Sequence, residues 1–300
     1  MSVERDPHLA SVAGVVDVER FGPDAERLPA DVLLELPHGC TAVADFAALA
    51  AQMRSTLPPD LQAFFCVNTD VGTPELGAAV AARLAAAGKR VLVVRSRLPR
   101  TLVDCNRTAD PELGAGLTGL IPAYVRDPSD IELLRDLHAR YLAAARAGWA
   151  EVLATGGRGL SLHSYAPRSV PIERVTDRIV EELRAYWAAP EALPLRPEID
   201  LIVVGADGAL YADPALCAAI ETAYAANDRA VSRSATYKLH PAAFAGEMAL
   251  HAPMQALTIE FRRDLLAEPW DPFVEMRVPQ GRADALAAPL AAALLAVAER

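Results

Sequence analysis

The sequence predicts an α/β fold in which helices cover both faces of a mostly parallel mixed sheet, giving three layers. Short apolar runs alternate with longer amphipathic or Ala-rich segments, which is typical of a parallel sheet. The 300 residues are 52% hydrophobic, enough for one sizeable core or two small ones. Because no repeat, low-complexity tract or linker interrupts them, we expect residues 1–300 to form a single domain.

The individual elements follow from apolar spacing and from Gly and Pro. Pro37 ends the first strand, Gly88 closes the second helix, and Ser129 is the expected N-cap of the long helix. The expected strands are 32–36, 63–67, 90–94, 159–166, 199–204, 234–239 and 256–261. The expected helices are 41–54, 73–87, 130–147, 171–188 and 214–226, with a loop or short helix at 241–251 and a helix or helix pair at 283–297. The stretches 96–107 and 110–127 are expected to be loops.

Composition narrows the class of partner. Acidic residues outnumber basic ones by 39 to 29 and no basic stripe appears, so neither nucleic acid nor an anionic membrane is an expected partner, and a small metabolite fits better. The apolar C-terminal stretch is shorter than the about 20 residues that span a bilayer. The N-terminus has no signal-peptide pattern, and the four cysteines are far apart, which favours buried thiols in a reducing, cytoplasmic setting.

Polar side chains follow several of the expected strands. His38, Asp70, the run Asp104 to Arg107, and His163 all lie at strand ends or in the loops after strands. In open α/β sheets ligands bind outside the carboxyl ends of the strands, so these clusters are expected to converge. Two histidines plus a carboxylate are typical of a catalytic zinc site, although a single buried histidine is more often structural. Alternation places Ser161 on the same strand face as His163.

Two further residues are candidates for chemistry. Glu260 lies on the polar face of an otherwise apolar strand, which indicates either a solvated edge strand or a general base directed into the cleft. Arg107 has the fork geometry to bind a substrate carboxylate, and the neighbouring Asn106 can add an amide contact. The alternative for Arg107 is a surface ion pair with Asp104 or Asp110.

Several motifs in order resemble those of N-formylglutamate amidohydrolases. The run SRLPRTLVDCNR (96–107) resembles their Ser-Arg and Asp-x-Asn-Arg signature, PHG (37–39) resembles Pro-His-Ser-Gly, and SLHSY (161–165) resembles Asp-Leu-His-Ser. The Thr-Asp pair at 69–70 and ALTIEFRRDLL at 256–266 resemble a Thr-Asp element and a late Glu-bearing strand. That family is similar to the zinc carboxypeptidases, so the resemblance implies a carboxypeptidase-like α/β fold.

The resemblance also implies roles for particular residues. His38 and His163 would be ligands of Zn²⁺ or another divalent metal, Arg107 with Asn106 would bind the substrate carboxylate, and Glu260 would be general base and acid. Asp70 is taken as the third ligand, because Thr41 stands where carboxypeptidases have a Glu. The remaining candidates for substrate binding are Arg97, Asp104, His138 and His251.

The implied function is a metal-dependent hydrolase of an N-acyl amino acid such as N-formylglutamate, acting on a small-molecule carboxylate. One alternative is a non-catalytic carboxylate-binding or assembly protein on the same fold, favoured by Thr41, by Ser161 in place of Asp, and by a shortened loop at 244–251. Another is a zinc carboxypeptidase for small peptides, which shares the site and differs in substrate size.

Overall fold

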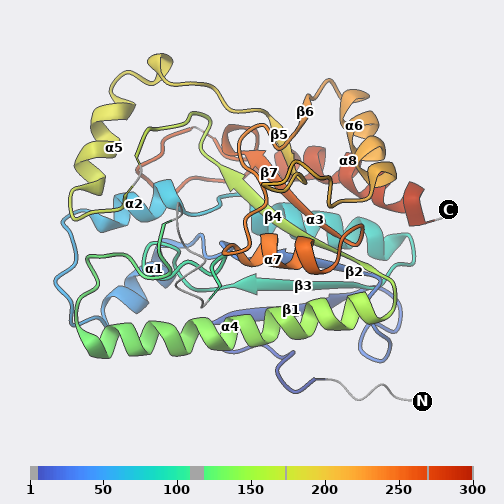
Figure 1. Cartoon of the computed structure of the whole chain (residues 1–300), viewed down its shortest axis with the longest axis horizontal. Coiled ribbons are helices and arrows are strands. Elements are labelled where there is room, and N and C mark those ends of the chain that lie inside the picture. The colour runs from blue at the N-terminus through green and yellow to red at the C-terminus, as the bar shows by residue number, and fades with distance from the viewer. Residues whose placement is uncertain (1–5, 109–117, 173, 269, 299–300) are drawn as a thin grey trace.

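A mixed sheet forms the centre of the computed structural model, which describes residues 6–108, 118–172, 174–268 and 270–298 (Figure 1). Its seven strands have the order β1-β3-β2-β4-β7-β5-β6. Only β1 on β3 and β5 on β7 pair antiparallel, whereas the other four pairings are parallel. The predicted mostly parallel mixed sheet is therefore confirmed. The strands are β1 Val16–Phe21, β2 Val32–Leu36, β3 Val91–Ser96, β4 Arg158–Tyr165, β5 Ile199–Ile202, β6 Val231–Arg233 and β7 Ala256–Arg262.

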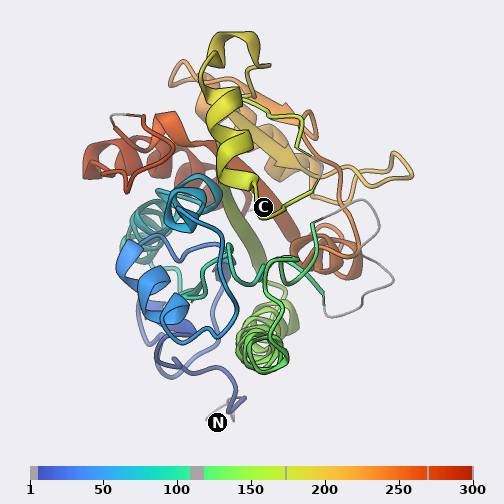
Figure 2. The same ribbon diagram turned by 90° about the vertical axis from the view of Figure 1, so that its left-hand side faces the viewer.

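Helices cover both faces of this sheet. Figure 2 shows α3 and α8 on one side of β4 and β7, and α4 and α7 on the other. The first face has a core shared by α3, α6 and α8, and the second a core shared by α1, α2, α4, α5 and α7. The helices are α1 Val43–Ala50, α2 Leu61–Asn68, α3 Thr73–Ala86, α4 Pro128–Ala154, α5 Ile179–Trp187, α6 Pro214–Ala225, α7 Phe244–His251 and α8 Gln280–Ala298, with short 3-10 helices at Pro190–Ala192 and Arg263–Leu265.

Alternation along the central strands separates apolar from polar side chains. In β4, Leu160 and Leu162 lie in the core formed with α3 and α8, whereas Ser161 and His163 lie on the face covered by α4. Ser161 and His163 thus share a face, as predicted. Gly159 lets α4 approach closely, because a Cβ there would lie 2.0 Å from the ring of Trp149. This close packing closes the polar face of the sheet off from solvent at its centre.

The expected strand at 63–67 is wrong, because these residues belong to helix α2. A five-residue apolar run fits a buried helix as well as a strand. The helix buries Phe64 and Phe65 together, and the Phe65 ring stacks on Phe46 of α1 with 5.1 Å between centroids. Asp70 therefore follows a helix, and not a strand.

Other boundaries also differ from expectation. The short strand predicted at 234–239 is wrong, because β6 covers Val231–Arg233 and no strand follows it there. Helix α5 begins at Ile179 rather than near 171. The N-cap of α4 is Asp127, whose carboxylate accepts from the backbone N–H of Ser129. The edge strand β1 was not predicted. The C-terminal stretch forms one helix with Pro289 inside it.

All four cysteines are buried free thiols, as expected. Among the helices of the described residues, none combines the length and apolar character needed to cross a bilayer. Within the expected loop at 110–127, residues 110–117 lie outside the described residues, and 118–127 form neither helix nor strand.

Candidate metal centre and active site

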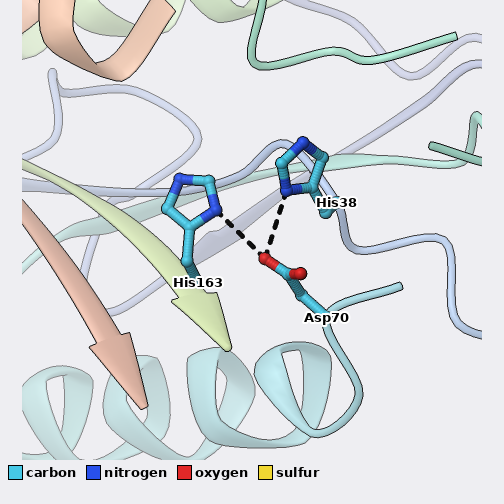
Figure 3. Close-up of side chains that lie close together, drawn as sticks. All are labelled: His38, Asp70 and His163. Carbon is cyan, nitrogen blue, oxygen red and sulfur yellow. Dashed lines mark hydrogen bonds and ion pairs between the residues drawn. The ribbon is translucent and has the colours of Figure 1, made fainter. Parts of the chain in front are cut away.

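Three buried side chains from separate parts of the chain meet at the carboxyl end of the central strands (Figure 3). His38 lies two residues beyond β2, His163 lies on β4, and Asp70 lies in the loop between α2 and α3. Asp70 Oδ2 is 3.2 Å from His38 Nδ1 and 3.0 Å from His163 Nδ1. One ligand atom from each residue lies within 4.8 Å of the others. The structure thus brings together the three residues proposed as metal ligands from the sequence.

Local backbone contacts hold His38 and Asp70 in place. The N–H of Asp70 donates to the carbonyl of His38, and the Thr69 hydroxyl donates to the carbonyl of Cys40. Asp70 also supports the start of α3, because its carbonyl accepts from the Thr73 hydroxyl at 2.9 Å. The turn after β2 and the turn before α3 are therefore fixed to each other, although 32 residues separate the two side chains.

Each imidazole is held at its far nitrogen. His38 Nε2 lies 2.7 Å from Asp104 Oδ1, and His163 Nε2 lies 3.1 Å from Ser161 Oγ. Both Nδ1 atoms are thereby directed at the same oxygen of Asp70. Two imidazole nitrogens and one carboxylate oxygen are the donor set of a catalytic zinc site that leaves a position open. Partners at the far nitrogen of a ligating histidine fix its ring orientation. The residues present therefore fit a divalent metal ion.

The second oxygen of Asp70 is occupied by a buried arginine. Arg263 Nη2 lies 3.2 Å from Asp70 Oδ1, and the same guanidinium donates to the carbonyls of Ser164 and Val67. Burial lowers the pKa of Arg263 to about 10, against the attraction of Asp70. Arg263 was not among the predicted site residues, because nothing in the pair Arg262-Arg263 indicates which side chain turns inward.

Within this cluster the pKa of Asp70 is lowered and that of His163 is raised. Burial works against ionisation of Asp70, but His38 and His163 outweigh it and hold the Asp70 pKa well below its usual value. Burial likewise opposes charge on His163, but hydrogen bonding to Asp70 raises its pKa. Without a metal, His163 and Asp70 therefore stabilise each other's charged forms.

Glu260 lies beside this cluster on β7, directly opposite His163 in the strand register. Its Oε2 is buried and has no hydrogen-bond partner among the described residues. Burial raises the pKa of Glu260 and the charge of Asp70 raises it further, against the attraction of His163 and two arginines. A carboxylate without a partner and with a raised pKa is suited to accept and release a proton.

Arg107 is held by partners within its own loop. Its Nε donates to the carbonyl of Thr118, Nη1 to the carbonyl of Asn106, and Nη2 to the Thr118 hydroxyl. Nη2 also lies 3.3 Å from Asp104 Oδ2. Every nitrogen of the guanidinium thus already has a partner within the loop. Asn106 is equally engaged, since its Oδ1 accepts from the Ala245 N–H at the start of α7.

Arg100 is more accessible than Arg107, and it was not among the site residues predicted from the sequence. Its side chain is 26% exposed, with Nε 3.3 Å from Asp104 Oδ2 and Nη1 3.9 Å from Asp70 Oδ1. It also attracts the charge of Glu260. Arg100 lies four residues before Asp104 inside the predicted site loop, where no local signal distinguishes it from Arg97.

Arg97, predicted to bind substrate, is not brought to the cluster. Its guanidinium pairs with Asp17 at 3.1 Å and with Asp45 at 2.7 Å, near β1 and α1. Its backbone N–H donates to the carbonyl of Val15, which extends the β1–β3 pairing by one residue.

The other predicted substrate contacts also have structural partners. Buried His138 places Nε2 2.9 Å from the carbonyl of Arg107, so it supports the site loop from α4. His251 is exposed on α7, where Nδ1 lies 2.9 Å from the carbonyl of Glu247. The Glu247 carboxylate pairs with Arg146 and not with His251.

Comparisons with known proteins bear on the family and the fold of the chain. A sequence model described as N-formylglutamate amidohydrolase matches residues 30–267. The crystal structure of N-formylglutamate amidohydrolase from Ralstonia eutropha JMP134 aligns over 94% of this chain and 97% of its own, with 20% identity and a TM-score of 0.59. A gene product from Agrobacterium tumefaciens aligns over 95% and 96%, with 18% identity and a TM-score of 0.53.

A third structure is more distant. A metallo-carboxypeptidase from Burkholderia cenocepacia aligns over 94% of this chain and 60% of its own, with 14% identity and a TM-score of 0.42. No curated protein matches the chain by sequence.

Proposed function

Because the chain belongs to the N-formylglutamate amidohydrolase family, we propose that it hydrolyses the amide of an N-acyl amino acid such as N-formylglutamate. The proposal includes a divalent metal ion, such as zinc, held by His38, Asp70 and His163. The observation that carries it is the buried convergence of these three donors beside Glu260, whose Oε2 has no partner within the described residues.

The residues divide the reaction between them. A divalent ion at such a site acidifies water and polarises a carbonyl oxygen. Glu260 accepts the proton of the attacking water and returns it to the amine nitrogen as the amide bond breaks. The products are a carboxylic acid and an amino acid, which balances the addition of one water. The raised pKa of Glu260 suits it to both transfers.

The substrate carboxylate is assigned to Arg100. Its guanidinium is partly exposed beside Asp70 and Asp104, whereas the nitrogens of Arg107 are engaged within the loop. Arg107 and Asp104 then keep the loop in place, and Asp104 also holds the far nitrogen of His38. Asn106 connects the same loop to α7.

The test begins with protein purified without chelator. Elemental analysis gives the metal content, and N-formyl, N-acetyl and peptidyl amino acids are screened as substrates. At matched metal occupancy, Glu260→Gln should lower kcat by roughly 10²- to 10⁴-fold, the usual contribution of general acid–base catalysis. Its metal content and melting temperature should stay near those of the wild type. Glu247→Gln on α7, which removes the partly buried partner of Arg146, is the matched control.

Each outcome separates one alternative. If Glu260→Gln turns over at the wild-type rate, Glu260 is not the base. If the protein binds metal and carboxylates but hydrolyses no substrate, the result supports the alternative of a non-catalytic carboxylate-binding protein. A preference for peptides over N-formyl amino acids indicates a small-peptide carboxypeptidase instead. Loss of metal in His163→Ala, but not in His138→Ala, checks the ligand assignment.

A further inference from the structure

Glu35 is a buried carboxylate that the proposed reaction does not use. It lies in the middle of β2 with 0% exposure, between the apolar residues Leu34 and Leu36. Its Oε1 accepts from the Tyr141 hydroxyl of α4 at 2.6 Å. Its Oε2 is buried and has no hydrogen-bond partner of ordinary geometry in the described part of the chain. Burying such a group is costly unless it is satisfied, so its position calls for a reason.

The strand register places Glu35 beside the support of a proposed metal ligand. Glu35 on β2 is paired with Ser161 on β4, and Ser161 Oγ lies 3.1 Å from His163 Nε2. The charge of Glu35 and the imidazole of His163 also attract each other. The three groups therefore form a line along the polar face of the sheet, from carboxylate through hydroxyl to imidazole.

The number of available protons decides which group donates in each hydrogen bond between Glu35, Ser161 and His163. The Ser161 hydroxyl has one proton to donate and lone pairs to accept with. If His163 Nε2–H donates to Ser161, then the serine proton is free for Glu35 Oε2. That arrangement leaves the lone pair of Nδ1 facing Asp70 and the metal position. If the serine proton points at His163 instead, Glu35 Oε2 stays unsatisfied. The buried carboxylate thus favours the form of His163 that binds a metal through Nδ1.

The imidazole of His38 is supported by a carboxylate directly, with no hydroxyl group between them. His38 Nε2 meets Asp104 Oδ1 directly at 2.7 Å. We propose that Glu35, acting through Ser161, is a positioning residue that fixes the ring orientation and the N–H of His163 for metal binding. The inference rests on the proposed function, since it takes the metal at His38, Asp70 and His163 as its premise.

The test measures zinc affinity rather than turnover. The dissociation constant of the full chain is determined by competition with a chromophoric chelator for the wild type, Glu35→Gln, Ser161→Ala and the double variant. Each single change should weaken zinc binding by about 10- to 100-fold, the usual effect of losing such an outer partner. The double variant should bind zinc about as tightly, within a few-fold, as the single variant that binds zinc less tightly. Thr258→Val, which removes the hydroxyl next to Ser161 in the register, should bind as the wild type does.

A second measurement distinguishes positioning from general stabilisation. Nitrogen NMR of the metal-free wild type, with His163 in its neutral form, should show the ring proton on Nε2, and Glu35→Gln should reduce that population. Melting temperatures of the metal-free proteins report any loss of fold, and Ser161→Ala carries the affinity test if Glu35→Gln does not fold.

The inference is overturned if Glu35→Gln or Ser161→Ala binds zinc as tightly as the wild type, or if their losses multiply in the double variant. A wild-type protein that binds no zinc overturns the proposed function and this inference with it. Wild-type binding with unaffected variants overturns the inference alone.

Discussion

Replacing Asp70 by Asn tests whether charge organises the metal-free cluster. Asp70 is the buried anion that faces the buried guanidinium of Arg263, whose other partners are the neutral Ser164 and Val67. Removing one member of a buried ion pair costs about 3 to 5 kcal/mol, and the lower value applies because Asn keeps an oxygen for Arg263. At about 2 to 4 °C per kcal/mol, the melting temperature of the metal-free protein should fall by roughly 6 to 12 °C.

An ion pair that is more accessible to solvent provides the control. Asp45 pairs with Arg97 at 2.7 Å, but their side chains are 26% and 30% exposed. Asp45→Asn should therefore cost less than about 1 kcal/mol. Both variants are compared with the wild type by urea denaturation of metal-free protein at pH 7. If Asp70→Asn destabilises no more than Asp45→Asn, the buried pair does not hold the centre together.

Two further predictions concern pH and substrate. In the metal-free protein the raised pKa of His163 contributes stability that is complete below pH 6.5 and is lost as the pH rises through the raised value. The lowered pKa of Asp70 contributes stability that is present above pH 3.8 and is lost as the pH falls through the lowered value. The free energy of unfolding should therefore peak between pH 3.8 and 6.5, and denaturation curves across pH should show this peak in the wild type but not in Asp70→Asn. Arg100→Ala should cost about 1.5 to 3 kcal/mol in kcat/KM for an acyl amino acid, as expected for a hydrogen bond to a charged group. Arg97→Ala should leave kcat/KM unchanged, and equal losses in the two variants would place the carboxylate elsewhere.

The sequence was informative where chemistry follows strand ends. Pro37 stops β2 immediately before His38, and alternation in β4 fixes the face of His163, so both imidazoles could be placed from local pattern. Asp70 was placed for a reason that is wrong in detail, because α2 and not a strand precedes it. It still reaches His38, since its backbone N–H donates to the His38 carbonyl.

The site loop shows why the remainder could not be predicted. Arg97 and Arg100 lie in the same run of mixed charges, and nothing local distinguishes them. Their orientations depend on distant contacts, with Arg97 bound to Asp17 on β1 and Arg100 next to Asp70. Glu35 is a similar case, since its hydroxyl partner Tyr141 is 106 residues away on α4.

Two carboxylates near the same imidazole, His163, are shifted in opposite directions, and this difference supports the division of roles. Asp70 faces two imidazoles, which hold its pKa well below the usual value, and its other carboxylate oxygen pairs with Arg263. Burial raises the pKa of Glu260, whose Oε2 has no such partner among the described residues. When an active site separates the pKa values of two neighbouring acids, the lower one serves as the fixed charge and the higher one exchanges protons. The same separation therefore supports Asp70 as ligand and Glu260 as base, and exchanging the two roles would require a protonated ligand beside a permanently charged base.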